Sequence, residues 1–352
     1  MAFKYFWKPL LTGWCLLLAH QMTAQSHPTM PGTEFITHPE DSTIEVRIDG
    51  AYFTSLLYSR TLEKPILYPL ISPQGLTVTR GFPRDPRPGE RIDHPHQVGL
   101  WFNYGDVNGL DFWNNSSAIP NDQLEQYGKI VLDNYKLVED QDVPSLTIHC
   151  TWQDHAGNGL LREKTIFKFQ RLDNANVIDR ITTLSAIVEV TMEDNKEGLI
   201  GMRVSRELEL PSDQPAIFTD AQGHATEVKA LDNSRVTGNY LSSEGLTGDA
   251  VWGTRGRWVR LAGVLEGKPV SIVIIDHPDN VGYPTYWHAR GYGLFAANPL
   301  GQSVFSSGEQ ALHFRLSKGS SRTFRYRVAV HDGSALPTAV IEKWFEDFSR
   351  NQ

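Results

Sequence analysis

Apolar residues alternate with polar ones along much of the chain, and this pattern predicts half-buried β-strands. The alternation is regular over residues 44–48, 146–152, 312–316 and 324–330, where every second residue is apolar. Because successive side chains on a strand point to opposite faces, each of these segments offers one apolar face to a core. Turns rich in Gly, Asn, Asp and Pro separate such segments, as is typical of antiparallel strands.

The apolar spacing changes to a helical period near the C-terminus. Pro337 precedes five apolar residues that share one helical face, which predicts a helix over residues 337–349. These five residues are Val340, Ile341, Trp344, Phe345 and Phe348. Many short strands and one terminal helix predict an all-β fold, a large antiparallel β-sandwich of two extended sheets with one C-terminal α-helix. The chain shows neither a linker nor a repeat, so we expect a single domain over residues 41–350.

Residues 1–24 have the pattern of a signal peptide. Two lysines precede a short apolar run, Leu10–Ala19, and small residues after it predict cleavage following Ala24. The run is shorter than the roughly 20 residues that a membrane helix needs. We therefore expect a periplasmic or extracellular protein without an integral membrane segment, in which residues 25–40 form a loose polar leader.

The composition is that of a folded, acidic protein. Hydrophobic residues make up 40% of the chain and charged residues 21%, which is sufficient for a large core. A formal net charge of −8 without a basic run predicts that nucleic acid is not a partner. Cys150, the one cysteine beyond the predicted signal peptide, falls on the apolar face of its strand, so we expect a buried and unreactive thiol.

Polar and aromatic side chains are dense in residues 93–113. His94 and His96 are two positions apart, and on an extended chain their imidazoles point to the same side, where they suit proton transfer or a metal ion. The catalytic candidates here are His94, His96, Asp106 and Asp111, and the substrate-binding candidates are Asp93, Trp101, Asn108 and Trp113. Asp106 and Asn108 equally fit a turn whose side chains bind their own backbone.

A second dense set lies in residues 276–301. If residues 287–292 are extended, His288, Arg290 and Tyr292 share one face, and Arg290 can stabilise negative charge on an oxygen. A buried Arg290 paired with an acid is the structural alternative. The catalytic candidates here are His288 and Arg290, and the substrate-binding candidates are His277, Asn280, Trp287, Tyr292 and Asn298.

Two further stretches carry weaker signals. On a strand over residues 201–207, Arg203, Ser205 and Glu207 lie opposite Val204, which favours a solvated face with Glu207 as a spare carboxylate. The stretch 252–258 combines Trp, Gly and Arg residues and fits either a loop wall or a structural turn. The chain contains no Gly-x-Ser-x-Gly elbow, phosphate loop, dinucleotide fingerprint or His-Glu-x-x-His motif.

Taken together, these motifs resemble the signature of the so-called PmoA family, a bacterial domain of unknown function. In the first half they are His94-Pro95-His96, Gly99-Leu100-Trp101-Phe102, Gly105-Asp106-Val107-Asn108-Gly109 and Asp111-Phe112-Trp113. In the second half they are Trp252-Gly253-x-Arg255 with Trp258, His277-Pro278-x-Asn280, Trp287-His288-x-Arg290, Tyr292-Gly293-Leu294-Phe295 and Asn298-Pro299-x-Gly301. Gln97 and Val98 stand where the family usually has His and Arg, so position 97 is not expected to be a ligand or a proton carrier.

The resemblance implies a role in carbohydrate metabolism, because similar proteins accompany sugar oxidoreductases and glycan-use genes. The family name invokes a methane oxygenase, whose subunit of that name crosses the membrane several times. This chain contains no apolar segment of that length, so we do not expect methane oxygenase activity.

The leading functional hypothesis is an exported bacterial enzyme that acts on a glycoside or an oxidised sugar as a hydrolase, lyase or epimerase, with a site of His, Asp and Arg residues. Its expected partner is a small saccharide or glycan, bound against Trp101, Trp113 and Trp287. One alternative is a non-catalytic carbohydrate-binding protein. Another is a metal-dependent protein in which His94 and His96 bind a divalent metal; no other cofactor is expected. The sequence predicts no oligomeric state.

Overall fold

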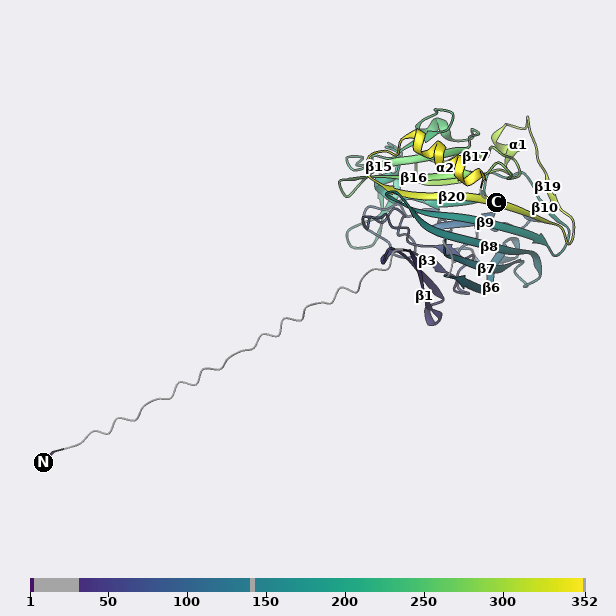
Figure 1. The fold of residues 1–352 in the computed structure, drawn as a ribbon. Helices are drawn as coiled ribbons and strands as arrows, with labels where there is room; N and C mark the ends of the chain where they lie inside the picture. The colour runs from purple at the N-terminus through teal and green to yellow at the C-terminus, as the bar shows by residue number, and fades with distance from the viewer. Residues whose placement is uncertain (3–31, 140–142, 351–352) are drawn as a thin grey trace.

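A computed structural model describes residues 1–2, 32–139 and 143–350 of the chain (Figure 1). Most of the predicted signal peptide and residues 25–31 of the predicted leader lie outside the described residues. Within the described part the chain forms two large antiparallel sheets of eight strands each. The predicted β-sandwich with a C-terminal helix is therefore confirmed.

The first sheet combines strands from both ends of the sequence. In spatial order its strands are β1 (Thr33–His38), β2 (Thr43–Ile48), β3 (Ala51–Leu57), β4 (Ile66–Leu67), β5 (Leu100–Tyr104), β11 (Gly198–Arg203), β18 (Leu294–Asn298) and β17 (Tyr286–Ala289). Neighbouring strands β5, β11 and β18 are far apart in the sequence, so the centre of this sheet is held by long-range pairing.

The second sheet is built mainly from long strands in meander order. Its strands are β14 (Asn239–Ser242), β15 (Trp258–Leu265), β16 (Lys268–Asp276), β20 (Ser321–Asp332), β9 (Ala175–Ala186), β8 (Gly159–Leu172), β7 (Ser145–Gln153) and β6 (Lys129–Val138). Two small sheets pair β10 (Val190–Met192) with β19 (Phe314–Leu316) and β12 (Ala216–Thr219) with β13 (Ala225–Val228). The remaining elements are η1 (Pro39–Asp41), η2 (Asn121–Gln126), η3 (Arg206–Leu208), η4 (Gly248–Val251), α1 (Gln302–Phe305) and α2 (Thr338–Arg350).

The core lies between the facing sides of the two large sheets. Phe53 and Ile200 from the first sheet belong to the same buried cluster as Phe169 and Val328 from the second. The alternation seen in the sequence accounts for this arrangement, since the apolar side chains at alternate positions of strands such as β2 and β20 enter the cluster.

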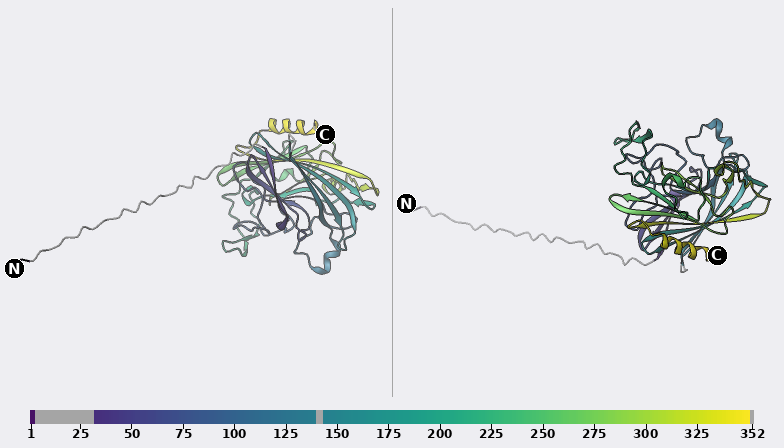
Figure 2. Two further views of the ribbon diagram at one scale, coloured as in Figure 1. Left: turned by 60° about the horizontal axis from the view of Figure 1, so that its bottom comes forward. Right: turned by 90° about the horizontal axis from the view of Figure 1, so that it is seen from above.

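Helix α2 covers the outer face of the second sheet (Figures 1 and 2). Its residues Ile341, Trp344 and Phe348 pack with Trp258 and Val273 of that sheet in a second apolar cluster. At 13 residues α2 is the longest helix in the described part of the chain, and no helix there is long and apolar enough to cross a membrane.

The predicted leader is wrong for residues 33–38, because they form strand β1. This strand pairs with β2 over six residue pairs, from Thr33 with Ile48 to His38 with Thr43. Phe35 is buried on β1, and the hydroxyl of Thr33 donates to the carbonyl of Phe169 at 2.8 Å, which ties the strand to the second sheet. The polar composition of the segment concealed an edge strand with one apolar face.

Candidate functional site

The outer face of the first sheet carries a row of four residues in register. Trp101 of β5 faces Gly201 of β11, Gly201 faces Ala296 of β18, and Ala296 faces His288 of β17. Their neighbours along each strand point into the core, so these four point away from it. Gly201 and Ala296, the two small residues in the middle, separate Trp101 from His288 along this row. We call this row the floor.

Gly201 is required at the floor because two indoles press against it. A methyl group at this position would lie 2.8 Å from the ring of Trp101 and 2.9 Å from that of Trp113. The ring centroids of the two tryptophans are 5.2 Å apart, and both side chains are fully buried. They therefore do not form the exposed stacking walls that the sequence suggested. Neither indole N–H has a hydrogen-bond partner among the described residues.

The two segments singled out in the sequence meet over the floor. The ring of His94 stacks on the ring of Tyr292 with 5.1 Å between centroids and an interplanar angle of 3°. His96 contacts His94 edge-on at 5.6 Å. The two histidines do not lie on an extended chain, as the sequence had suggested: His94 has a φ of 44°, and the amide of Gln97 donates to its carbonyl. A tight turn, not a strand, brings the rings together.

A buried arginine pair holds the turn in place. Arg80 donates to a carboxylate oxygen of Asp93 at 2.5 Å, and Arg203 donates to the same oxygen at 2.6 Å. The Nδ1 atom of His94 lies 3.4 Å from that oxygen. Burial acts to raise the pKa of Asp93, but the bond from His94 and the charges of Arg203 and Arg80 outweigh it and keep the pKa well below its usual range. Asp93 therefore stays ionised, and its negative charge orients the His94 ring.

Arg203 is fully buried, so the expectation of a solvated face on residues 201–207 is wrong for this residue. Its guanidinium donates to the side-chain oxygen of Gln97 at 2.5 Å and lies 4.7 Å from the centroid of the Tyr292 ring. Gln97 thus acts as a structural acceptor beneath the site. Glu207 instead accepts from Arg235 at 2.8 Å and takes no part in this network.

Glu197 and His288 lie together at one end of the floor. An oxygen of Glu197 is 4.0 Å from Nδ1 of His288, which itself lies 3.0 Å from the carbonyl oxygen of Lys196. A carbonyl oxygen only accepts, so Nδ1 of His288 carries the hydrogen and Nε2 is left with a lone pair. Burial lowers the pKa of His288 to about 3, and the charge of Arg290 adds to this effect.

The same surroundings raise the pKa of the Glu197 carboxyl. Burial is the main cause, and the negative charge of Asp111 adds to it, while Lys196 and His94 act in the opposite direction. Asn298, a predicted binding residue, has a positioning role here: its amide donates to the carbonyls of Asn195 and Lys196 and so fixes the segment that carries Glu197.

Lys64 and Asp111 lie near Trp101. The ammonium of Lys64 donates to the carbonyl of His96 at 2.9 Å and is 5.8 Å from the centroid of the Trp101 ring. Burial lowers the pKa of Lys64 to about 8 although Glu63 and Asp111 oppose it. Both oxygens of Asp111 accept hydrogen bonds from residues 113–114, so this carboxylate shapes the loop that holds Trp113.

Arg290 lies at the edge of a separate cleft of about 830 Å³, which Tyr292 also lines. The expected extended segment ends at Ala289, and a turn follows in which the amide of Gly293 donates to the Arg290 carbonyl. The guanidinium lies 5.8 Å from the Tyr292 ring centroid and 5.3 Å from that of the exposed Trp252. Arg290 therefore borders the site and does not form part of the floor.

Three predicted site residues are in structural positions away from the floor. The carboxylate of Asp106 accepts from the amide of Gly109 and closes a turn. Asn108 has a φ of 55°, and its amide bonds with the backbone of residues 189–191. Trp287 points into the central core and donates to the carbonyl of Gly256. For Asp106 the alternative of a self-bonding turn is the correct one, whereas the side chain of Asn108 bonds to the backbone of another segment.

His277 and Asn280 lie on the far side of the molecule, under helix α2. The His277 ring packs edge-on against Phe348 with 5.1 Å between centroids. Asn280 donates to Asp276 and exchanges two hydrogen bonds with the backbone of Arg325. Both residues stabilise the loop after β16, and neither reaches the site.

Sequence reasoning missed Lys64, Glu197 and Arg80. Each is the one site residue of its own segment, and none belongs to a motif. The positions beside Glu197 do carry a signal, because Gly198 and Gly201 interrupt an otherwise apolar strand, and a glycine within a strand indicates close approach by another group.

The metal-dependent alternative has no support in the ligand geometry. Among residues 32–139 and 143–350 there is no group of three or more His, Cys, Asp or Glu side chains placed to hold a metal ion. Within the described part of the chain, His94 and His96 are therefore not joined by a third such side chain in a metal-binding arrangement.

Residues 43–346 match the model of a family described as a family of unknown function, DUF6807. The chain belongs to this family. The expected membership of the PmoA family is therefore wrong, because DUF6807 is the family whose model matches. No match was found among curated proteins.

Solved structures with distant similarity include three sugar-active proteins. A galactose 1-epimerase from Lactobacillus acidophilus is 9% identical, with a TM-score of 0.42, and the match covers 86% of this chain and 100% of that one. An α-galactosidase from Lactobacillus brevis is 11% identical, with a TM-score of 0.39 and coverage of 86% and 39%. A GH36 α-galactosidase from Geobacillus stearothermophilus is 10% identical, with a TM-score of 0.40 and coverage of 86% and 41%. This chain thus spans about two fifths of the galactosidase chains.

Proposed function

We propose that this protein is an enzyme that moves protons on a saccharide by general acid–base catalysis, as an epimerase or a lyase does. The observation that carries the proposal is the pair formed by Glu197 and His288, 4.0 Å apart at one end of a floor over which His94 is held by Asp93. Burial raises the pKa of Glu197, which favours the protonated form that can act as an acid, and it keeps the imidazole of His288 neutral with a free lone pair.

The roles follow from how each group is held. Glu197 in its protonated form donates to an oxygen of the sugar. The side chain of His94 is 41% exposed and is oriented by the Asp93 carboxylate, so it can accept a proton from the ligand. The Nε2 lone pair of His288 is available as a second acceptor. His94 removes a proton from the sugar and Glu197 gives one to it, so the turnover leaves His94 protonated and Glu197 ionised. His94 then releases its proton to water and Glu197 takes one up from water, which restores the starting state.

Two-carboxylate hydrolysis fits the site less well. A glycoside hydrolase of that type needs one carboxylic acid and one carboxylate free to act on the sugar. Asp111 has both oxygens occupied by backbone and side-chain donors, and Asp93 is bound by Arg80 and Arg203. Glu197 is the carboxyl group at the floor that is free to act. One free carboxyl and two histidines favour proton transfer over displacement.

A saccharide suits the mixture of groups around the floor. A sugar hydroxyl both donates and accepts, and the site offers a donor in Lys64 together with acceptors in Glu197 and His288. A purely binding role is supported less well, because Trp101 and Trp113 are buried and offer no face for stacking.

A nuclear magnetic resonance experiment in D₂O tests the proposal. Neutral hexoses and uronic acids are incubated with the enzyme, and loss of a C–H signal or appearance of an epimer or an unsaturated sugar is followed over time. We expect one sugar to react, and the reaction to be lost in Glu197→Gln and His94→Ala. Binding by calorimetry without exchange or product would contradict the enzyme and favour a carbohydrate-binding protein.

We also propose that the protein acts outside the cytoplasm. The support is the pattern of residues 1–24, with its lysines, short apolar run and small residues before the expected cleavage point.

A further inference from the structure

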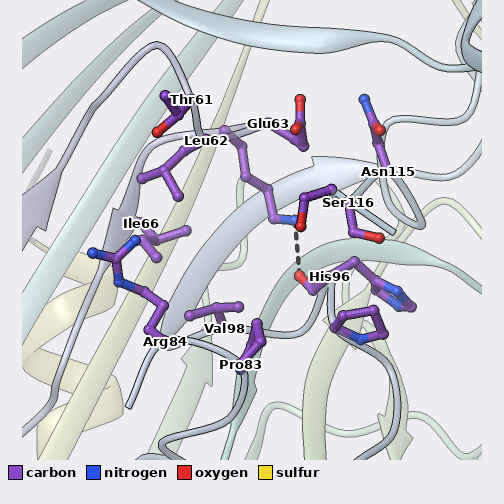
Figure 3. A pocket seen from close by; sticks show the side chains of 13 residues that line it. Thr61, Leu62, Glu63, Ile66, Pro83, Arg84, His96, Val98, Asn115 and Ser116 are labelled. Carbon is purple, nitrogen blue, oxygen red and sulfur yellow. Dashed lines mark hydrogen bonds between the residues drawn. The ribbon is translucent and has the colours of Figure 1, made fainter. Parts of the chain in front are cut away.

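A cavity of about 370 Å³ opens beside the floor, on the side of Lys64 and His96 (Figure 3). Figure 3 shows the His96 ring and the side chains of Asn115 and Ser116 along one side of this cavity and Arg84 along the other. His96 joins the cavity to the site, because its ring contacts His94 on the floor side. The proton-transfer groups do not occupy this space.

Lys64 is a buried cation without a counterion. Lys64 is 5% exposed, and no carboxylate of the described residues lies within 4.0 Å of its ammonium group. Of its three N–H donors, one bonds to the carbonyl of His96. Glu63 also lines the cavity, but it pairs with Lys129 at 3.4 Å. Burying a charge without a partner is costly, so the folded chain gains stability when an anion enters the cavity.

Two further buried polar atoms in this cavity have no partner. Neither Nε2 of His96 nor the side-chain oxygen of Asn115 has a hydrogen-bond partner within the described residues. Both residues are more than nine-tenths buried, at 8% and 6% exposure. Buried polar groups are nearly always hydrogen-bonded in folded proteins, so such a pair at a cavity indicates a place for a polar ligand.

We propose that this cavity binds the anionic oxygen group of an acidic saccharide, a carboxylate or a sulfate ester, and so selects a charged sugar for the neighbouring site. Lys64 supplies the cationic contact, His96 donates through its ring N–H, and Asn115 accepts from an adjacent sugar hydroxyl. The inference rests on the proposed function for the identity of the ligand as a sugar. Lys64 and His96 are then residues that determine specificity.

Calorimetry on the folded chain tests this subsite with defined probes. The panel is D-glucuronate, D-galacturonate and D-mannuronate, the 6-sulfates of the three parent hexoses, and the neutral hexoses themselves. We expect at least one anionic sugar to bind about tenfold or more tightly than its neutral parent, which is the difference that one charge-assisted hydrogen bond provides. The relative affinity of carboxylates and sulfates identifies the natural anion.

Lys64→Met removes the charge with little change in volume and should abolish the preference for the anionic sugar. Lys136→Met is the matched control, because this lysine is exposed on β6 and does not line the cavity. If Lys64→Met does not fold, Asn115→Asp places a negative charge in the cavity and should weaken anion binding to a similar degree. Equal affinity for charged and neutral sugars in the unmodified protein, or an unchanged preference in Lys64→Met, would overturn the subsite.

The result is separable from that of the proposed function. Glu197→Gln should still bind the anionic sugar while losing turnover, because Glu197 does not line the cavity. If anionic sugars bind through Lys64 but none reacts, the subsite holds and the enzyme proposal fails. If neutral sugars react as well as charged ones and Lys64→Met changes nothing, the enzyme proposal holds and the subsite fails.

Discussion

Among the described residues, no backbone amide donates to the Glu197 carboxyl, whose oxygens lie 3.4 Å from Nζ of Lys196 and 4.0 Å from Nδ1 of His288. A carboxyl group that is buried but loosely bonded can change its proton occupancy during a reaction. We expect Glu197→Gln to lower turnover by about 10²–10⁴-fold, the usual contribution of one acid or base. Glu207→Gln is the control, since Glu207 pairs with Arg235 away from the site. Similar rates in the two variants would argue against a catalytic Glu197.

The two buried histidines should make stability depend on pH. The pKa of His288 is lowered to about 3 and that of His96 to about 2, mainly by burial. Below about pH 6.5 the unfolded chain takes up protons at these residues and the folded chain does not, so stability falls as pH decreases toward the lowered pKa values. In this pH range each histidine lowers the free energy of unfolding by about 1.4 kcal/mol for every pH unit of acidification.

Urea unfolding at pH 7 and pH 5 measures this effect. His288→Asn should show a smaller loss of stability between the two pH values than the unmodified protein. His149→Asn, at an exposed position of β7, should leave the loss unchanged. An equal loss in all three proteins would show that His288 takes up its proton equally in the folded and the unfolded chain.

Some of the individual site residues could be predicted from the sequence. His94, His96 and His288 were found because imidazoles are rare and their neighbours are dense in polar residues. Lys64 and Glu197 were missed because strand pairing between distant segments brings them to the floor. No local pattern records that pairing, and a lone Lys or Glu in a sequence ordinarily indicates a solvated surface.

The floor depends on small residues in the strands. Gly201→Ala would bring a methyl group to 2.8 Å from the Trp101 ring and 2.9 Å from the Trp113 ring. Overpacking of this kind typically costs about 1–3 kcal/mol. We expect that loss in unfolding free energy, measured by urea titration, together with weaker sugar binding because the indoles shift. Unchanged stability and unchanged binding would show that the floor tolerates the extra volume.

Helix α2 is expected to contribute to stability without contributing to the site. Trp344→Ala removes a large buried side chain from the cluster between the helix and the second sheet, at a typical cost of about 3–5 kcal/mol. Lys343→Ala, on the exposed side of the helix, is the control and should cost little. Thermal unfolding measures the difference, and sugar affinity should be the same in both folded variants. A comparable melting temperature for the two would contradict the packing role.

Strands and helices are the features that the sequence predicts best. Apolar alternation over residues 44–48 and 324–330 corresponds to β2 and β20, and the helical period at 337–349 corresponds to α2. These patterns are local, so burial of one face is sufficient to predict them. Strand β1 was missed because an edge strand with few apolar residues has a weak local signal. The order of strands within a sheet requires long-range pairing, which alternation does not encode.

At the scale of the whole molecule, export can be tested directly. If residues 1–24 act as a signal peptide, the chain expressed in a bacterium with a periplasm should be recovered there with Gln25 as its first residue. Intact-mass measurement of the purified protein checks this. Because strand β1 begins at Thr33, cleavage at this point leaves every described strand complete. Recovery of uncleaved chain from the cytoplasm would contradict export.

The paired indoles at the floor also give the molecule an optical property. Trp101 and Trp113 lie 5.2 Å apart, fully buried, with both N–H groups unbonded directly beside the site. Indole emission depends on hydrogen bonding at the N–H, and two rings at this separation couple electronically. Comparison of the unmodified protein with Trp101→Phe isolates their signal from that of the other tryptophans. We therefore expect a ligand at the floor to change the tryptophan emission, so that binding can be followed without labelling.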